Sequence, residues 1–202
     1  MDLTSVAAFA LTATAIELTP GPNMVWLAIV AATDGRRAGF AAVAGVALGL
    51  SVIGIAAAWG MAAVIAASPL AYQALRWAGV AYLLWLAWDG WRGADDPPEH
   101  AALGSTLARY FQRGLITNLL NPKAFLFYIT VLPGFLSAPA RLPDTLVLTA
   151  IYVAVATLIH AAIVTGAGTA RDWLSHGTRA IMMRRALALA LVGVALWVVW
   201  KT

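Results

Sequence analysis

The chain has 202 residues, of which 62% are apolar and only 11% are charged, and its formal net charge is +4. Soluble domains carry about 25% charged residues, so the composition excludes an ordinary soluble protein and indicates a membrane protein. The basic residues do not predict nucleic-acid binding, because they are spaced between apolar runs instead of clustered on one face. With no cysteine, the chain has no disulfide, thiolate metal site or cysteine nucleophile.

Six apolar stretches follow one another, and a membrane-spanning helix needs about 20 such residues. We therefore expect an all-α, polytopic membrane protein with six transmembrane helices. The expected spans are residues 3–32, 40–67, 69–88, 115–136, 146–167 and 181–200. The third and sixth are short, but tryptophans at their ends suit the interface between lipid and water. No basic region precedes the first stretch, which is therefore not expected to be a signal peptide.

A polar linker, residues 93–100, divides the six spans into three and three, and a surface helix ending near Arg113 is expected after it. We predict a first three-helix repeat over residues 1–91, a cytoplasmic linker over 92–108 and a second three-helix repeat over 109–202. Because each half has an odd number of spans, the second half is inverted relative to the first, as an inverted-repeat transporter requires.

The distribution of basic residues between the loops predicts the orientation, because cytoplasmic loops carry an excess of lysine and arginine. With the N-terminus outside, only Arg76, Arg141 and Lys201 lie on the outer side. The cytoplasmic side then holds Arg36, Arg37, Arg92, Arg109, Arg113, Arg171, Arg179, Arg184 and Arg185. We therefore expect both termini on the outer side.

Two proline-interrupted motifs lie at corresponding places in the halves. They are Thr19-Pro20-Gly21-Pro22-Asn23, in the first span, and Asn118-Leu119-Leu120-Asn121-Pro122-Lys123, in the fourth. A broken helix leaves backbone groups without partners, so it survives in hydrocarbon only where it lines a cavity or a ligand site. A matched pair of breaks predicts the binding site of a secondary transporter, and a plain proline kink is the alternative.

The first motif supplies four candidate substrate-binding residues. Pro20 and Pro22 remove backbone donors, and Gly21 permits the backbone angles of a break. Pro22 can then begin a new half-helix, whose N–H groups suit a substrate carboxylate. Asn23 adds a side-chain donor and acceptor.

The second motif supplies Asn118, Asn121 and Pro122 as further candidates. We expect the two asparagines to satisfy broken backbone around Pro122, with Asn121 better placed to contact the substrate. Gly45 and Gly49 form a small-xxx-small pair, for which helix packing is the favoured role.

Glu17 and Lys123 are the charges deepest in the predicted hydrocarbon region, where ionisable groups usually pair inside the protein. We expect Glu17 to bind a substrate ammonium group or to carry a coupling proton. Lys123 would hold a carboxylate or pair with Glu17. The alternatives are a buried ion pair without a transport role and, for Lys123, a structural cation that satisfies the carbonyls exposed by Pro122.

His160, in the fifth span, is a second candidate for proton coupling, because imidazole titrates near neutral pH. A lone histidine that is hydrogen-bonded to a backbone carbonyl is the structural alternative.

Several of these motifs resemble a known family. Thr19-Pro20-Gly21-Pro22-Asn23, the run from Asp34 to Gly39 and Gly45-x3-Gly49 resemble the first half of the lysine-exporter (LysE) superfamily, in its threonine/homoserine-exporter-like (RhtB) branch. The run from Gly79 to Leu86 resembles its third-helix signature. Phe111-x2-Gly114-Leu115-x2-Asn118-x2-Asn121-Pro122-Lys123-Ala124 resembles its fourth-helix signature.

The resemblance implies a transporter of the bacterial inner membrane that exports amino acids or close derivatives, by proton antiport with alternating access as the two halves rock. It leaves a homodimer open and implies no cofactor. Relatives that export metal ions usually have cysteine or histidine clusters, which this sequence lacks.

Two alternatives stay open from the sequence. Efflux of another small polar metabolite or cation is the alternative among transporters. An intramembrane enzyme would need a nucleophile–base pair or a carboxylate pair on facing helices. Ser51 and His160 are present, but no serine elbow is, and Glu17 is the only firmly intramembrane carboxylate. A scaffold would not need two matched helix breaks.

Overall fold

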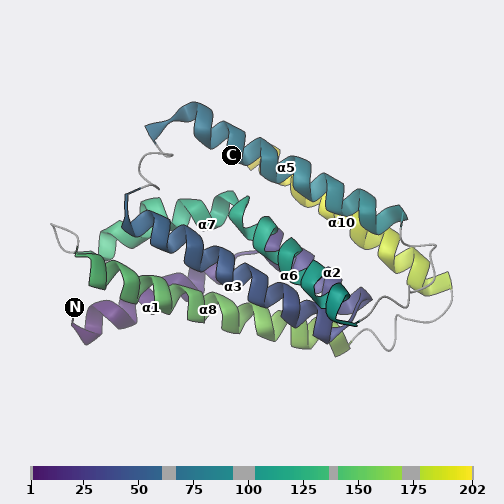
Figure 1. The fold of residues 1–202 in the computed structure, drawn as a ribbon, viewed down its shortest axis with the longest axis horizontal. Coiled ribbons are helices and arrows are strands. Elements are labelled where there is room, and N and C mark those ends of the chain that lie inside the picture. The colour runs from purple at the N-terminus through teal and green to yellow at the C-terminus, as the bar shows by residue number, and fades with distance from the viewer. Residues whose placement is uncertain (1, 61–66, 93–102, 137–140, 170–177, 202) are drawn as a thin grey trace.

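A computed structural model describes residues 2–60, 67–92, 103–136, 141–169 and 178–201, and every regular element in these ranges is a helix (Figure 1). The all-α expectation is therefore confirmed. Residues 93–102, which form most of the predicted linker, lie outside the described ranges, as do residues 61–66 of the second expected span.

The first expected span is two helices, α1 (Leu3–Leu18) and α2 (Pro22–Thr33), bent by 63°. Asp2 caps α1 by accepting a hydrogen bond from the Ser5 N–H at 2.7 Å. The helix ends at Leu18 because a residue before proline is driven out of the helical region, and Thr19 is extended before Pro20. Pro22 then occupies the first position of α2, where a missing N–H costs nothing.

The second broken span consists of α6 (Leu103–Leu119) and α7 (Pro122–Leu126), which a π-helical turn η1 (Phe127–Val131) and a 3₁₀ turn η2 (Leu132–Phe135) continue. The bend at this break is 51°. Asn121 caps α7 by accepting from the Lys123 N–H at 3.0 Å. The prediction that a surface helix ends near Arg113 is wrong, because α6 continues through Arg113 into the fourth span without a break.

Two long apolar helices, α3 (Arg36–Ala58) and α8 (Leu142–Thr169), are each able to cross a membrane by length and composition. The two bent pairs meet the same criterion if each counts as one span, which makes up to four crossings among the described residues. Helices α5 (Pro69–Arg92) and α10 (Thr178–Lys201) form where the third and sixth spans are expected, but they are less apolar. Six crossings in two inverted repeats therefore stay a prediction.

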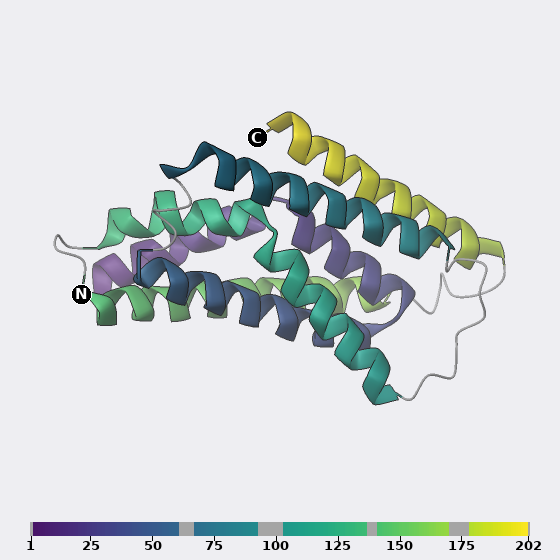
Figure 2. The same ribbon diagram turned by 45° about the horizontal axis from the view of Figure 1, so that its top comes forward.

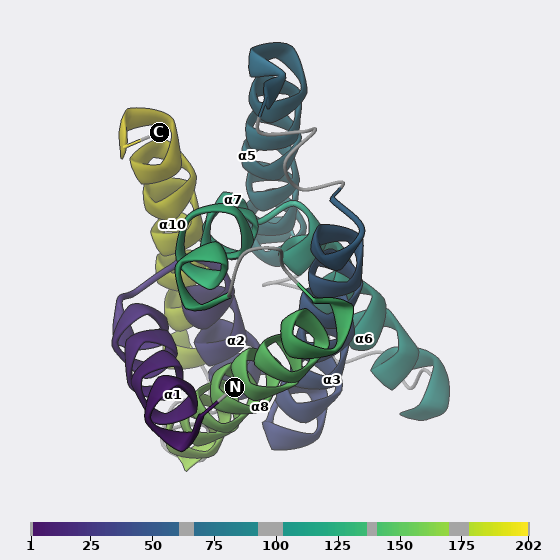
Figure 3. The same cartoon turned by 90° about the vertical axis from the view of Figure 1, so that its left-hand side faces the viewer.

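The helices of the two halves are interleaved. Helices α1 and α2 of the first half pack on α8 of the second, and α6 of the second half packs on α3 of the first. Seen end-on in Figure 3, α8 lies between α1 and α3, and α6 lies beyond α3. Helices α5 and α10 run side by side as a separate pair (Figures 1 and 2), which meets the rest through α2, α6 and α7.

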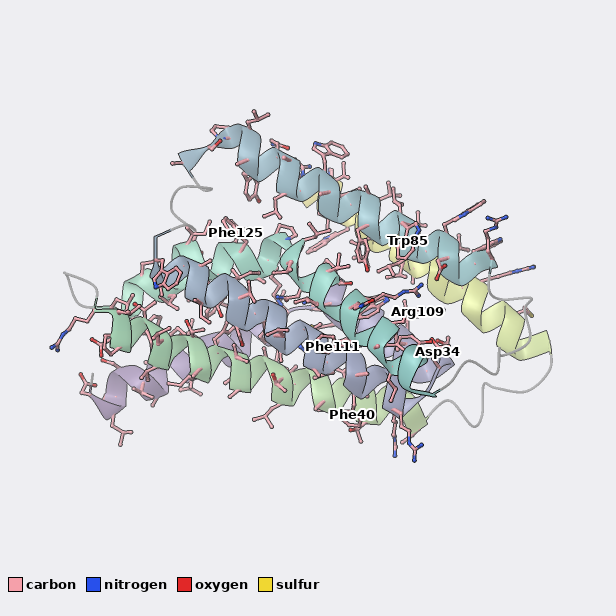
Figure 4. The ribbon with its side chains drawn as sticks, viewed as in Figure 1. Asp34, Phe40, Trp85, Arg109, Phe111 and Phe125 are labelled. Carbon is pink, nitrogen blue, oxygen red and sulfur yellow. The ribbon has the colours of Figure 1, made fainter. Side chains whose placement is uncertain are left out.

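The distribution of polar side chains is that of a membrane protein. Large apolar side chains such as Leu158 and Leu196 are exposed on the outside. The buried polar and charged side chains are Glu17, Asn23, Thr117, Asn118, Asn121, Thr145, Thr149 and His160. In Figure 4 charged side chains gather toward the end of the molecule where Asp34 and Arg109 are labelled. An apolar exterior around a polar interior suits a lipid environment.

Helices α3 and α6 approach each other closely through glycines. A Cβ atom at Gly45 would overlap with the Phe111 carbonyl of α6, and one at Gly114 would overlap with the Ala42 carbonyl of α3. At Gly49 an added Cβ would lie 2.9 Å from Asn118 Nδ2. The packing role expected for Gly45 and Gly49 is therefore confirmed.

We expect Gly45→Ala to destabilise the protein by about 1–3 kcal/mol, because the methyl group has no room between the two backbones. Thermal unfolding in detergent measures the effect. Gly193→Ala in α10 is the control, because a Cβ there meets open space and alanine favours a helix. Equal unfolding temperatures for the two variants would contradict the close α3–α6 packing.

Candidate functional site

The two helix breaks meet in space. Lys123, in the first turn of α7, donates from Nζ to the Thr19 carbonyl at 2.7 Å, where α1 ends. Its aliphatic chain lies against Gly21, where an added Cβ would be 3.2 Å from Lys123 Cδ. Lys123 therefore satisfies a carbonyl exposed by the break in the other half of the chain.

A second crossing contact joins the same breaks in the opposite sense. Asn23, which follows Pro22, donates from Nδ2 to Asn118 Oδ1 at 2.7 Å, near the end of α6. Both side chains are buried, and Asn23 Oδ1 and Asn118 Nδ2 have no further hydrogen-bond partner among the described residues. In each half, the residue that follows the proline of the break thus contacts the end of the helix that precedes the break in the other half.

Glu17 lies at the centre of a cluster of polar side chains and is only 5% exposed. Its Oε1 accepts a hydrogen bond from the Tyr152 hydroxyl at 2.7 Å and lies 4.0 Å from Lys123 Nζ. Its Oε2 lies 3.6 Å from His160 Nε2. The hydrogen bond to a backbone carbonyl that was the alternative for His160 is not found in the described residues, where neither ring nitrogen has a hydrogen-bond partner.

These side chains line a small cavity between the breaks. Seven of its lining residues are predicted site residues: Glu17, Gly21, Asn23, Asn118, Asn121, Lys123 and His160. The other four are Met24, Leu50, Ala124 and Tyr152. The cavity has room for about one water molecule, so an amino acid fits only if the surrounding helices move apart.

The three predicted prolines lie outside this cavity. Pro20 is exposed, whereas Pro22 and Pro122 are buried and line a second small cavity toward α5 and α10. Their contribution to the first cavity is therefore made through the backbone breaks that they cause.

An aromatic cluster, formed by Phe9, Phe127, Tyr128, Phe135 and Tyr152, closes one side of the site. The rings of Phe127 and Tyr152 stack with their centroids 3.7 Å apart, and Phe9 meets Phe127 edge-on at 5.8 Å. Because Phe9 lies two turns before Glu17 on α1, the cluster covers the side of Glu17 toward the N-terminus of that helix.

Sequence reasoning missed Tyr152, although a signal was present. Four buried polar residues follow one another on the largely apolar α8 at intervals of four, three and eight residues: Thr145, Thr149, Tyr152 and His160. Polar residues that recur at helical spacing within a predicted span mark the face that turns to the interior.

The residues that the structure describes contain no group of three or more histidine, cysteine, aspartate or glutamate side chains that could hold a metal ion. The site therefore presents one carboxylate, one ammonium group, an imidazole and neutral amide and hydroxyl groups.

Comparison with known proteins identifies the family of the chain. The model of the family described as LysE type translocator matches residues 14–201. This match agrees with the expectation that the protein is a transporter and not an enzyme. No solved structure matches significantly.

Three relatives illustrate the similarity. The homoserine/homoserine lactone efflux protein of Salmonella typhimurium is 33% identical over 64% of this chain and 63% of its own length. The leucine efflux protein of Klebsiella pneumoniae is 33% identical over 63% of this chain and 61% of its own. An uncharacterised membrane protein of Vibrio cholerae is 32% identical over 70% and 69%. The chain thus spans less than two thirds of the length of either efflux protein.

The crossing contact between the breaks is expected to stabilise the fold. In a double-mutant cycle of Asn23→Ala and Asn118→Ala, we expect a coupling free energy of about 1 kcal/mol, because each truncation leaves the other buried amide without its partner. Thermal or denaturant unfolding in detergent measures it. The cycle of Asn23→Ala with Thr130→Ala is the control, because the exposed Thr130 hydroxyl bonds within its own segment. Equal coupling in the two cycles would contradict the direct contact.

Proposed function

Because the chain belongs to the LysE type translocator family, we propose that it exports an amino acid or close derivative across the bacterial inner membrane. The names of the two efflux relatives support a substrate of this class. The proposal includes proton antiport and alternating access, and it assigns substrate binding to the residues that line the cavity between the breaks.

The observation on which the proposal rests is the pairing of one carboxylate with one ammonium group at the place where the breaks meet. Glu17 Oε1 and Lys123 Nζ lie 4.0 Å apart in the cavity wall. An amino acid carries the same two charged groups on one α-carbon. Its ammonium group would replace Lys123 beside Glu17, and its carboxylate would be received by Lys123.

The start of α2 adds a second attraction for the carboxylate. Pro22 begins this helix, so its first N–H groups have no partner within the helix and carry partial positive charge. The free amide atoms of Asn23 and Asn118 lie in the same wall and offer one acceptor and one donor to the substrate. Half-helix ends are a common way for transporters to hold a substrate carboxylate.

A single buried carboxylate also accounts for antiport. Glu17 can be neutralised by a proton or by the substrate's ammonium group, but one carboxylate in a cavity of this size does not hold both. Binding of either one excludes the other, and that competition couples their movements in opposite directions. His160, 3.6 Å from Glu17, is placed to relay the proton.

The pattern of helix contacts supports two related halves, residues 1–91 and 109–202, joined by a linker. Packing of α1 and α2 on α8 corresponds to packing of α6 and α7 on α3, and the crossings of Asn23 and Lys123 also correspond. In this proposal the halves are inverted repeats with six spans.

The proposed orientation places both termini on the periplasmic side. Arg36, Arg37 and Arg92 lie at the helix ends opposite the N-terminus of α1, which suits the cytoplasmic face. A homodimer in the bilayer, which the resemblance leaves open, stays part of the proposal, and light scattering of the detergent-solubilised protein can test it.

An ion pair joins the halves toward this arginine-rich end. Arg113 of α6 donates to Asp89 of α5 at 2.8 Å, and its guanidinium group lies 5.1 Å from the Trp85 ring centroid. Trp85 is labelled in Figure 4 where α5 passes over α6. Partly exposed ion pairs of this kind contribute little to the stability of a fold. We therefore predict that the Arg113–Asp89 pair serves to hold this end of the molecule closed.

The first experiment is efflux from proteoliposomes loaded with a mixed pool of amino acids, with and without a pH gradient. We expect one or a few amino acids to leave only when the gradient is imposed. If the inserted protein releases none of them, the proposed substrate class is wrong.

Glu17→Gln should abolish gradient-driven efflux, because an amide neither takes up a proton nor attracts an ammonium group. The variant must insert normally, which size-exclusion chromatography in detergent checks. Asp144→Asn is the matched control, since this carboxylate lies in the first turn of α8, away from the cavity. Wild-type efflux by Glu17→Gln would refute the assigned role.

Alternating access can be tested at the Arg113–Asp89 pair, because the chain has no native cysteine. We expect a short thiol-cleavable linker between cysteines in Asp89→Cys/Arg113→Cys to stop efflux, and a reducing agent to restore it. The two single-cysteine variants, treated alike, are the controls. Unchanged efflux by the bridged protein would show that this end does not open.

A further inference from the structure

Tyr152 is the residue most closely bound to Glu17. It lies on α8, it is 0% exposed, and its hydroxyl donates to Glu17 Oε1 at 2.7 Å. Its ring stacks on Phe127 within the aromatic cluster, at 3.7 Å and an angle of 9° between the planes. The stacking fixes the ring, so the hydroxyl is held at the carboxylate from a rigid support.

The other titratable groups that face Glu17 are more distant. Lys123 Nζ of α7 lies 4.0 Å from Oε1 and gives its hydrogen bond to the Thr19 carbonyl. His160 Nε2 of α8 lies 3.6 Å from Oε2, beyond hydrogen-bond distance. Tyr128 of η1 packs against the Tyr152 ring but donates its hydroxyl to the Leu50 carbonyl. Within the described residues, the Tyr152 hydroxyl therefore makes the direct hydrogen bond to this carboxylate.

A hydroxyl donor at this place fixes the direction of one carboxylate oxygen, and hydrogen bonds to charged groups are stronger than those to neutral groups. A phenol can also accept a hydrogen bond, so the contact persists in the reverse sense when Glu17 is protonated. Lys123 lacks this property, because an ammonium group only donates. Tyr152 thus has a partner in both states of an exchange.

From these contacts we infer that Tyr152 is a positioning residue that holds the Glu17 carboxylate in the orientation in which it receives the substrate's ammonium group. The inference rests on the substrate binding proposed above and adds a residue that determines its affinity.

The test is Tyr152→Phe, which keeps the ring and its stacking on Phe127 and removes only the hydroxyl. Substrate exchange across vesicles without a pH gradient is measured at one pH against substrate concentration. Loss of the hydrogen bond that orients Glu17 should raise the concentration for half-maximal exchange by about ten-fold, with the maximal rate little changed. Tyr128→Phe is the matched control, because it removes a neighbouring buried hydroxyl that contacts a backbone carbonyl instead. No measurable shift is expected for it.

A second measurement is independent of transport. Infrared difference spectroscopy detects the stretch of the Glu17 carboxyl group, whose frequency depends on its hydrogen bonds, and Glu17→Gln assigns the band. At one fixed pH, this band should lie at a different frequency in purified Tyr152→Phe than in the wild-type protein. If wild-type vesicles show no exchange, the proposed function fails, and the infrared band still decides the role of Tyr152.

Two results would overturn the inference. One is an unshifted infrared band in Tyr152→Phe, and the other is an equal shift in Tyr128→Phe. If Tyr152→Phe does not fold, 3,5-difluorotyrosine at position 152 replaces it, because this side chain keeps the ring and hydroxyl and donates more strongly. The Glu17 band should then also lie at a different frequency from that of the wild type, and an unchanged band would overturn the inference.

Discussion

The structure depends on one constraint, which is that a helix broken inside a hydrophobic layer must find partners for its backbone within the protein. Here each break supplies partners to the other. Lys123 donates to the Thr19 carbonyl at the end of α1, and Asn23 donates to Asn118 near the end of α6. Neither half could bury its break alone. The same contacts that satisfy the backbone bring Lys123 beside Glu17, so the charge pair and the fold have a common origin.

Much of the fold follows from two sequence signals, hydropathy and proline. Prolines end α1 and begin α2 and α7, because their fixed backbone angle suits the first turn of a helix and disfavours the residue before them. The convergence of the breaks follows less directly, since it depends on how α2 crosses α6. The link from Tyr152 to Glu17 depends in turn on which face α8 presents, and an interval of 135 residues gives no local signal of it.

Helices α5 and α10 show why span prediction is ambiguous. Arg76 of α5 donates to the Val199 carbonyl of α10, and the Arg185 guanidinium group of α10 lies 5.3 Å from the centroid of the Trp91 ring of α5. Charged side chains within these helices are thus satisfied by the neighbouring helix. Such arginines lower the hydropathy from which a span is predicted, whereas helix packing supplies them with partners.

The interleaved packing also limits how the site can open. Glycines bring the α3 and α6 backbones together, and α8 lies against α3, so three helices from both halves form one tightly packed layer. Parting the halves as two bodies would break that layer. Helix α1 packs on α8, η1 and η2, and the α5–α10 pair meets the layer near the breaks. Glu17 lies on α1, and the second cavity lies beneath α5 and α10. We therefore expect displacement of these outer elements to enlarge the site while the α3–α6–α8 layer stays intact.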